Sequence, residues 1–224
     1  MMEIVLSPRV LEAKDWAAFL FVFSFALIAV TRTTFETRFN DFLKILVSDK
    51  YIKVYKDSSH LMSGFTILLF IVQVISFSFF IQLSLAHFGY VSKTDWILFI
   101  RIFTFFGVFV LSKFLIEKII ATVFNIEEFT EQLNLQKVSY RTFIGLMLLP
   151  INIYLFYNDT SSNLLIFCII GIILIINLYS YLVSLKIYQN LLLGKLFYFI
   201  LYLCALEIAP YYFIYYLITK NLAH

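Results

Sequence analysis

The sequence predicts an all-α membrane protein, a polytopic bundle of about six transmembrane helices in one domain over residues 1–224. Of its 224 residues, 62% are hydrophobic and only 14% are charged, whereas a soluble globular domain carries roughly 25% charged residues. The chain therefore has too little polar surface to cover itself in water, and it must contact lipid. Its long apolar runs lack the alternation of polar and apolar residues that a barrel strand shows, which favours helices.

Six apolar stretches have, or nearly have, the length of about 20 residues that a membrane-spanning helix needs. The first is short, the second carries no formal charge, and the fifth is the most apolar. The third contains Arg101, the fourth Pro150 and the sixth Glu207. The predicted spans cover about 16–31, 65–86, 96–115, 142–157, 164–185 and 196–218.

The connections between these spans predict the orientation of the chain. Lys and Arg are enriched in cytoplasmic connections, and the basic residues of the connections, with Lys113 at the end of the third span counted among them, divide unequally between the two sides. We therefore expect both termini outside and the long connections in the cytoplasm. The cytoplasmic side would hold Arg32, Arg38, Lys44, Lys50, Lys53, Lys56, Lys113, Lys118, Lys137, Arg141, Lys186 and Lys195, and the outer side Arg9, Lys14, Lys93 and Lys220.

Amphipathic helices are predicted in the two long connections. Thr33 and Glu36 have the spacing of a capping box, and apolar residues at helical spacing follow over about 34–47. This segment is interpreted as a helix that lies on the inner membrane face, or alternatively as a cap packed on the bundle. Arg38 is expected away from its apolar face. The apolar residues are Phe35, Phe39, Phe42, Leu43 and Leu46 in this helix, and Ile119, Val123, Ile126 and Phe129 in a second, weaker one.

Glu207 lies near the centre of the sixth span, where a charged side chain costs about 2.5 to 3.5 kcal/mol on insertion scales. Arg101 is the other formal charge well inside a predicted span. At 1.5 Å per residue, Glu207 lies deeper than Arg101 by roughly 8 Å, a gap that helix tilt and the long arginine side chain reduce. We therefore predict that the two side chains meet inside the bundle, as a structural clamp or as a proton or ligand site.

Further polar residues at membrane depth are candidates to support this pair. Tyr202 precedes Glu207 on the same stretch and would donate to it if it faces inward. Gln73, Asn152 and Asn177 are amides suited to hydrogen bonds between helices. No hydrolase, zinc-protease, P-loop or dinucleotide-binding motif is present, and Cys168 and Cys204 lack metal-ligand spacing. No metal and no cofactor are expected.

The C-terminal stretch resembles a known family. "LFYFILYLCALEIAPYYFIYYLITK" is similar to the closing signature of the uncharacterised Bacteroidota membrane proteins with domain of unknown function 4271, and "KDW" at Lys14–Trp16 is similar as well. Tyr211 and Tyr212 depart from the aliphatic residues expected there. The resemblance implies a multi-pass protein of a bacterial inner membrane, so that both termini would be periplasmic, and it implies no activity. Its matching residues are Tyr202, Leu203, Cys204, Leu206, Glu207, Ile208 and Pro210.

These observations leave three functions open. The absence of catalytic motifs favours a structural or accessory subunit of an envelope assembly, with the lipid bilayer and another membrane protein, or a second copy, as partners. The alternative is a small transporter or channel that uses Arg101 and Glu207 as a midplane site. An intramembrane enzyme acting on a lipid-linked substrate is the third. A nucleic-acid partner is not expected.

Overall fold

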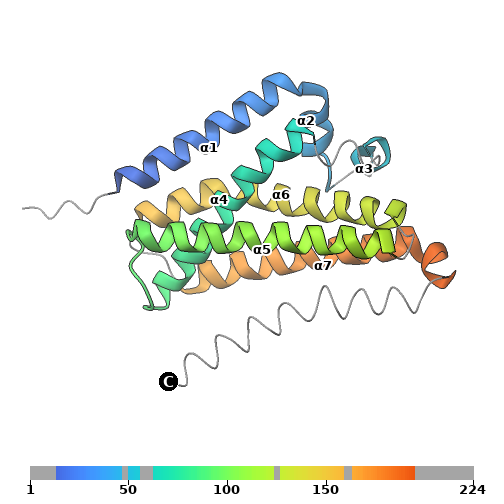
Figure 1. The fold of residues 1–224 in the computed structure, drawn as a ribbon. Helices are drawn as coiled ribbons and strands as arrows, with labels where there is room; N and C mark the ends of the chain where they lie inside the picture. The colour runs from blue at the N-terminus through green and yellow to red at the C-terminus, as the bar shows by residue number, and fades with distance from the viewer. Residues whose placement is uncertain (1–13, 47–49, 56–62, 124–126, 159–162, 195–224) are drawn as a thin grey trace, which may run out of the picture.

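The computed structural model describes residues 14–46, 50–55, 63–123, 127–158 and 163–194, with side chains up to Tyr179 apart from those of residues 53, 128, 129, 132 and 163. These residues form helices joined by short connections (Figure 1). The helices are α1 (Asp15–Thr34), α2 (Glu36–Leu43), α3 (Lys50–Val54), α4 (Gly64–His87), α5 (Trp96–Val123), α6 (Glu127–Tyr157) and α7 (Asn163–Gly194).

Helix α4 is the centre of the bundle. It packs against α1, α5 and α6, and α7 packs against α6. Figure 1 shows α5, α6 and α7 running nearly alongside one another, while α4 crosses them between α1 and α6. Burial reflects this arrangement. In the most apolar stretch of 18 residues, 56% of the residues of α4 are buried, compared with 11% of those of α5. The central helix therefore meets protein on several sides, whereas α5 keeps most of its surface outside the described bundle.

Aromatic residues fill the apolar core at both ends of the bundle. At the end where α5 begins, called here the Trp96 end, Phe79 stacks on Trp16 at 5.6 Å and on Phe21 at 4.4 Å between ring centroids. At the opposite end, called the Tyr51 end, Phe42 packs edge-on against Tyr51 and Phe65. Such pairs add roughly 0.5 to 1.5 kcal/mol beyond area burial, so α2 and α3 are fixed to the bundle.

Four of the described helices are long and apolar enough to cross a membrane: Asp15–Thr34, Gly64–His87, Trp96–Val123 and Leu133–Tyr157. They correspond to the first four predicted spans. The fourth predicted span, 142–157, is the C-terminal part of α6, which begins already at Glu127. Leu133, Leu135 and Tyr140, which precede the predicted span, are buried by the rest of the protein. The fifth predicted span, 164–185, lies within α7 (Asn163–Gly194), and the sixth lies outside the described residues.

The predicted capping box does not form. Thr33 belongs to α1, where its hydroxyl donates to the carbonyls of Ala29 and Val30, and α2 starts after Phe35 without a side-chain cap. The helix continues through Thr33 because this back-bonding satisfies the hydroxyl within α1. The backbone is not helical at Phe35, and residues 36–43 then form a separate helix.

The apolar face of α2 packs on the protein. Phe39 and Phe42 are 5% and 1% exposed, within a cluster that includes residues of α4 and α6. The described geometry thus agrees with the cap interpretation, although Leu43 and Leu46 remain exposed. The second predicted amphipathic helix is not separate, because Ile119 and Val123 form the last turns of α5.

Candidate functional site

Polar side chains between α4 and α6 form the first candidate site, called here the α4–α6 seam and defined as Gln73, Ser76, Thr142 and Asn152. The Thr142 hydroxyl donates to Gln73 Oε1 at 2.8 Å. The Asn152 amide Nδ2 donates to the Ser76 carbonyl at 2.7 Å and to its hydroxyl at 3.2 Å. All four residues are at most 3% exposed. Each bond joins two helices, so the seam locks α4 and α6 in one register.

Gly145 allows the seam to form. A Cβ added at this position would lie 3.0 Å from the Gln73 Cα and 3.2 Å from its Cγ. Small residues let membrane helices approach closely, and hydrogen bonds between the helices then become possible. The same α6 face thus carries a contact between helices at Gly145 and polar groups on either side of it, Thr142 one turn before and Asn152 two turns after.

The second candidate is a buried arginine at the Tyr51 end. Arg38 is 6% exposed, and its guanidinium carbon lies 4.6 Å from the ring centroid of Phe65 and 5.0 Å from that of Tyr55. Its nitrogens donate to the Ser63 hydroxyl at 2.7 Å and to the Tyr51 hydroxyl at 3.4 Å. Guanidinium groups are stabilised over aromatic faces, so Arg38 connects α2, α3 and the start of α4. Arg38 and the residues it contacts, Tyr51, Tyr55, Ser63 and Phe65, are called here the Arg38 centre.

Burial shifts the pKa of a tyrosine in the Arg38 centre. Desolvation raises the pKa of the Tyr51 phenol, although the Arg38 charge and hydrogen bonds from Arg38 and Ser139 act in the opposite direction. Desolvation prevails because the phenolate would lose its hydration in this pocket of aromatic rings. Tyr51 is therefore neutral at physiological pH and serves as a hydrogen-bonding partner.

Arg38 was expected away from the apolar face of its helix, and this was wrong. Arg38 shares the buried side with Phe42 and Ile45, at spacings of four and seven residues. That spacing was the available signal, because residues at i, i+4 and i+7 occupy one helix face. The seam partners Ser76 and Thr142 were also missed as sites, since single hydroxyl residues in apolar helices are common.

A third polar group lies on the face of α5 that points into the protein. Lys113 and Glu117 are 8% and 4% exposed and stand one turn apart, a spacing that places opposite charges side by side on a helix. Lys113 was counted among the basic residues of a cytoplasmic connection. It is buried because α6 extends along α5 at the Tyr51 end, where the predicted fourth span had not yet begun.

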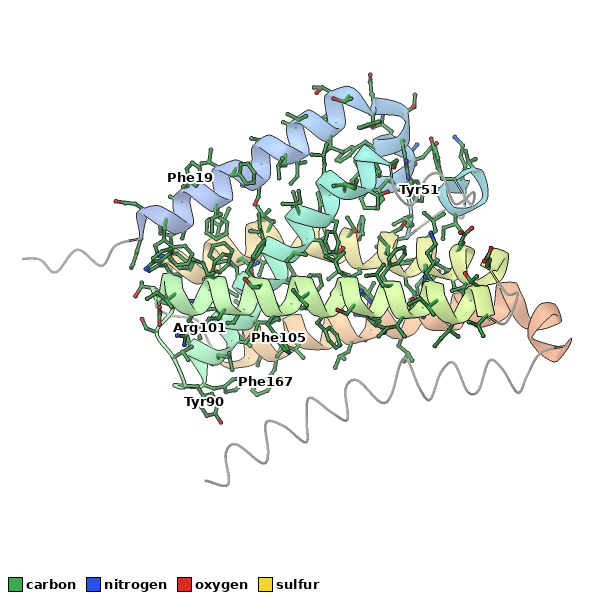
Figure 2. The ribbon with its side chains drawn as sticks, viewed as in Figure 1. Phe19, Tyr51, Tyr90, Arg101, Phe105 and Phe167 are labelled. Atoms are coloured by element: carbon green, nitrogen blue, oxygen red, sulfur yellow. The ribbon has the colours of Figure 1, made fainter. Side chains whose placement is uncertain are left out.

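The predicted intramembrane pair is described on one side only. Arg101 is exposed on α5 (Figure 2), one turn before Phe105, which is 62% exposed. Glu207 and Tyr202 lie outside the described residues, so their approach to Arg101 stays a prediction. Gln73 and Asn152 form hydrogen bonds between α4 and α6, as was predicted for these amides. Asn177 instead donates to the Ile173 carbonyl of its own helix.

The described residues offer little for metal or covalent chemistry. No group of three or more His, Cys, Asp or Glu side chains that could hold a metal ion occurs among them. The polar groups of the seam are amides and hydroxyls, and the hydrogen bonds across it join them to one another and to the Ser76 carbonyl. The geometry is that of helix–helix adhesion.

Comparison with known proteins gives a family and no activity. No curated protein and no solved structure matches the chain. A family model described as a domain of unknown function matches residues 17–218, which include every described helix except the first two residues of α1. The chain therefore belongs to the family of the domain of unknown function DUF4271.

Proposed function

We propose that this protein is a structural or accessory subunit of an assembly in a bacterial envelope, and that it works by presenting a rigid helical bundle within the inner membrane. The observation that carries the proposal is the α4–α6 seam. Its hydrogen bonds of 2.7 and 2.8 Å join side chains of one helix to the other. Polar groups at this depth therefore serve adhesion between helices, where a transporter would direct them toward a hydrated route.

The rest of the described surface fits the same role. Helix α5 exposes a run of large apolar side chains, among them Phe105, Val108 and Leu115, each more than half exposed. Such a surface suits contact with lipid or with another membrane protein. The Arg38 centre adds rigidity at the Tyr51 end of the bundle, since it ties α2 and α3 to the start of α4.

The Arg101–Glu207 pair enters this proposal as a clamp. Arg101 is exposed, so neither α4 nor α6 covers it. A counter-charge from the apolar stretch of about 196–218, in which Glu207 is central, would satisfy the arginine and hold that stretch against α5. This role needs no water route, in contrast to the transporter alternative, which depends on access to Glu207.

The proposal is tested by purifying the tagged full-length chain from its native membrane in mild detergent. We expect a partner in stoichiometric amount, or a defined self-association, by mass spectrometry and light scattering. Crosslinking in intact membranes before lysis controls for loss of a partner in detergent, and an untagged strain controls for background. A chain that runs as a lone monomer in both samples would contradict a role as a subunit.

A further inference from the structure

A cavity of about 340 Å³ opens at the Trp96 end of the bundle. Its buried floor is apolar and consists of Leu83 from α4, Leu155 from α6 and Ile166 from α7. Its polar lining comes from His87 at the end of α4, Lys93 in the following connection and Asn158 just after α6. The volume lies within the range of small-molecule sites, roughly 300 to 1,000 Å³.

The wall that carries Lys93 is held in place by a buried side chain. Gln82 is 1% exposed, and its Nε2 donates to the carbonyl of Asp95 at 2.8 Å and to those of Ser92 and Lys93 at 3.4 Å. The connection turns at Gly89, where φ is +79°, a conformation that other residues rarely adopt. The backbone of the cavity wall is therefore set by the fold.

The acidic residue of this connection has a separate role. The Asp95 carboxylate accepts hydrogen bonds from the backbone N–H groups of Ile97 and Leu98, at 3.0 and 3.2 Å. It therefore caps the N-terminus of α5, where a negative charge is favourable. The Asp95 carboxylate thus serves the helix N-terminus and is not part of the cavity lining. In the lining, Lys93 carries a cationic ammonium group and His87 a ring that can donate a hydrogen bond.

Exposed aromatic residues surround this end of the bundle. Tyr90 is 70% exposed, Trp96 55% and Tyr157 48%, and Figure 2 shows Tyr90 and Phe167 at the end of the bundle opposite Tyr51. The ring of Phe167 on α7 lies 6.0 Å from that of Phe88. Amphipathic aromatic rings gather at the level of lipid headgroups. Below this level α7 exposes Phe167, Ile172 and Ile175, an apolar surface suited to acyl chains.

We propose that this cavity binds the phosphate headgroup of an anionic phospholipid, whose acyl chains lie along the exposed face of α7. The Lys93 ammonium, a His87 ring N–H and the Asn158 amide would donate hydrogen bonds to the phosphate oxygens. A zwitterionic lipid carries the same phosphate but adds a cationic amine, which Lys93 would repel. The site thus selects for headgroup charge.

The test uses the purified full-length chain in detergent, titrated with phosphatidylglycerol or phosphatidylcholine. Native mass spectrometry counts the bound lipids, and thermal unfolding follows the stabilisation that binding confers. We expect phosphatidylglycerol to bind about tenfold more tightly, as a single charge-assisted contact would give. Lys93→Gln should abolish this preference. The matched control is Lys118→Gln, which removes the same charge from an exposed position on the last turns of α5, at the Tyr51 end, and should keep it.

A second variant tests the cavity without changing charge. Ala86 lines it, and Ala86→Phe should fill it and weaken binding of both lipids in a chain that still elutes as a single species. Equal binding of the two lipids by the unmodified chain would overturn the proposal, as would a preference that survives Lys93→Gln. Inorganic phosphate that stabilises the chain as much as phosphatidylglycerol would overturn the assignment to a lipid.

Discussion

Thr142 and Gln73 join α6 to α4 through a hydrogen bond of 2.8 Å, both side chains being buried inside the bundle. Double-mutant cycles on such bonds in another membrane protein average about 0.6 kcal/mol, with a maximum near 1.7. Because Gly145 brings the two backbones together at the same place, Gln73 has little room to find another partner. The bond should therefore lie in the upper part of that range.

This bond is tested by a double-mutant cycle with Thr142→Val and Gln73→Leu. Each single change should destabilise the chain, and the coupling should be about 1 kcal/mol, measured by unfolding in detergent micelles. Ser78→Ala is the matched control, since Ser78 is equally buried but donates to Val74 of its own helix. Additive effects of the two seam changes would show that the bond does not hold the helices together.

Gly145→Ala should destabilise the bundle by about 1 to 3 kcal/mol, as overpacking does. The added Cβ would lie 3.0 Å from the Gln73 Cα, and a backbone atom cannot turn away as a flexible side chain can. Gly171→Ala is the control on α7, because nothing lies within 4 Å of a Cβ there. It should leave stability unchanged or raise it, as alanine favours helix. Thermal unfolding of both variants in the same detergent measures the difference, and equal melting temperatures would argue against the close contact.

Arg38→Gln should cost about 2 to 4 kcal/mol of stability, since it removes both the aromatic contacts and the hydrogen bonds of a buried guanidinium. Arg38→Lys should recover little, because an ammonium cannot stack and donate in the same geometry. Arg32→Gln, at an exposed position on α1, should change stability by less than about 0.5 kcal/mol. Limited proteolysis of the connection 35–55 gives a second measure, as only the Arg38 variants should release it.

The raised pKa of Tyr51 predicts a loss of stability at alkaline pH. Above about pH 10 the unfolded chain releases the phenolic proton, whereas burial keeps it on the folded chain. The contribution is therefore complete below pH 10 and declines as the pH rises further, by at most about 1.4 kcal/mol per pH unit. Tyr51→Phe should make the alkaline decline shallower than in the unmodified chain, and Tyr90→Phe at an exposed position is the control. An unchanged slope in Tyr51→Phe would contradict the burial of this phenol.

Composition was sufficient to predict helices and their membrane character, because a run of about 20 apolar residues has few other stable solutions. The same reasoning failed where the protein itself supplies the apolar environment. Leu133 and Leu135 alternate with Asn134 and Gln136, and all four are buried, so hydropathy alone did not reveal that the helix begins well before the predicted fourth span. Burial there depends on α2 and α3, which pack on α6 from another part of the chain.

Polar residues were harder to place than apolar ones. Arg38 was placed away from the apolar face of its helix, and Lys113 was counted with a cytoplasmic connection, but both side chains are buried. Whether a given amide bonds across helices depends on rotation about the helix axis and on the neighbour it meets. Asn152 meets Ser76, whereas Asn177 is exposed and bonds to its own helix. Sequence spacing fixes the first of these factors approximately and the second not at all.

The predicted contact between Arg101 and Glu207 is tested by exchanging their charges. Arg101→Glu and Glu207→Arg should each lower the yield of folded chain in membranes, because each leaves like charges opposed. The double exchange should restore most of the yield, measured by fluorescence-detected size exclusion of a tagged chain. Lys118→Glu combined with Glu207→Arg is the control, since Lys118 lies at the opposite end of α5, and it should not restore the yield. A double exchange no better than the single changes would mean that Arg101 faces lipid or water and that Glu207 finds its counter-group elsewhere.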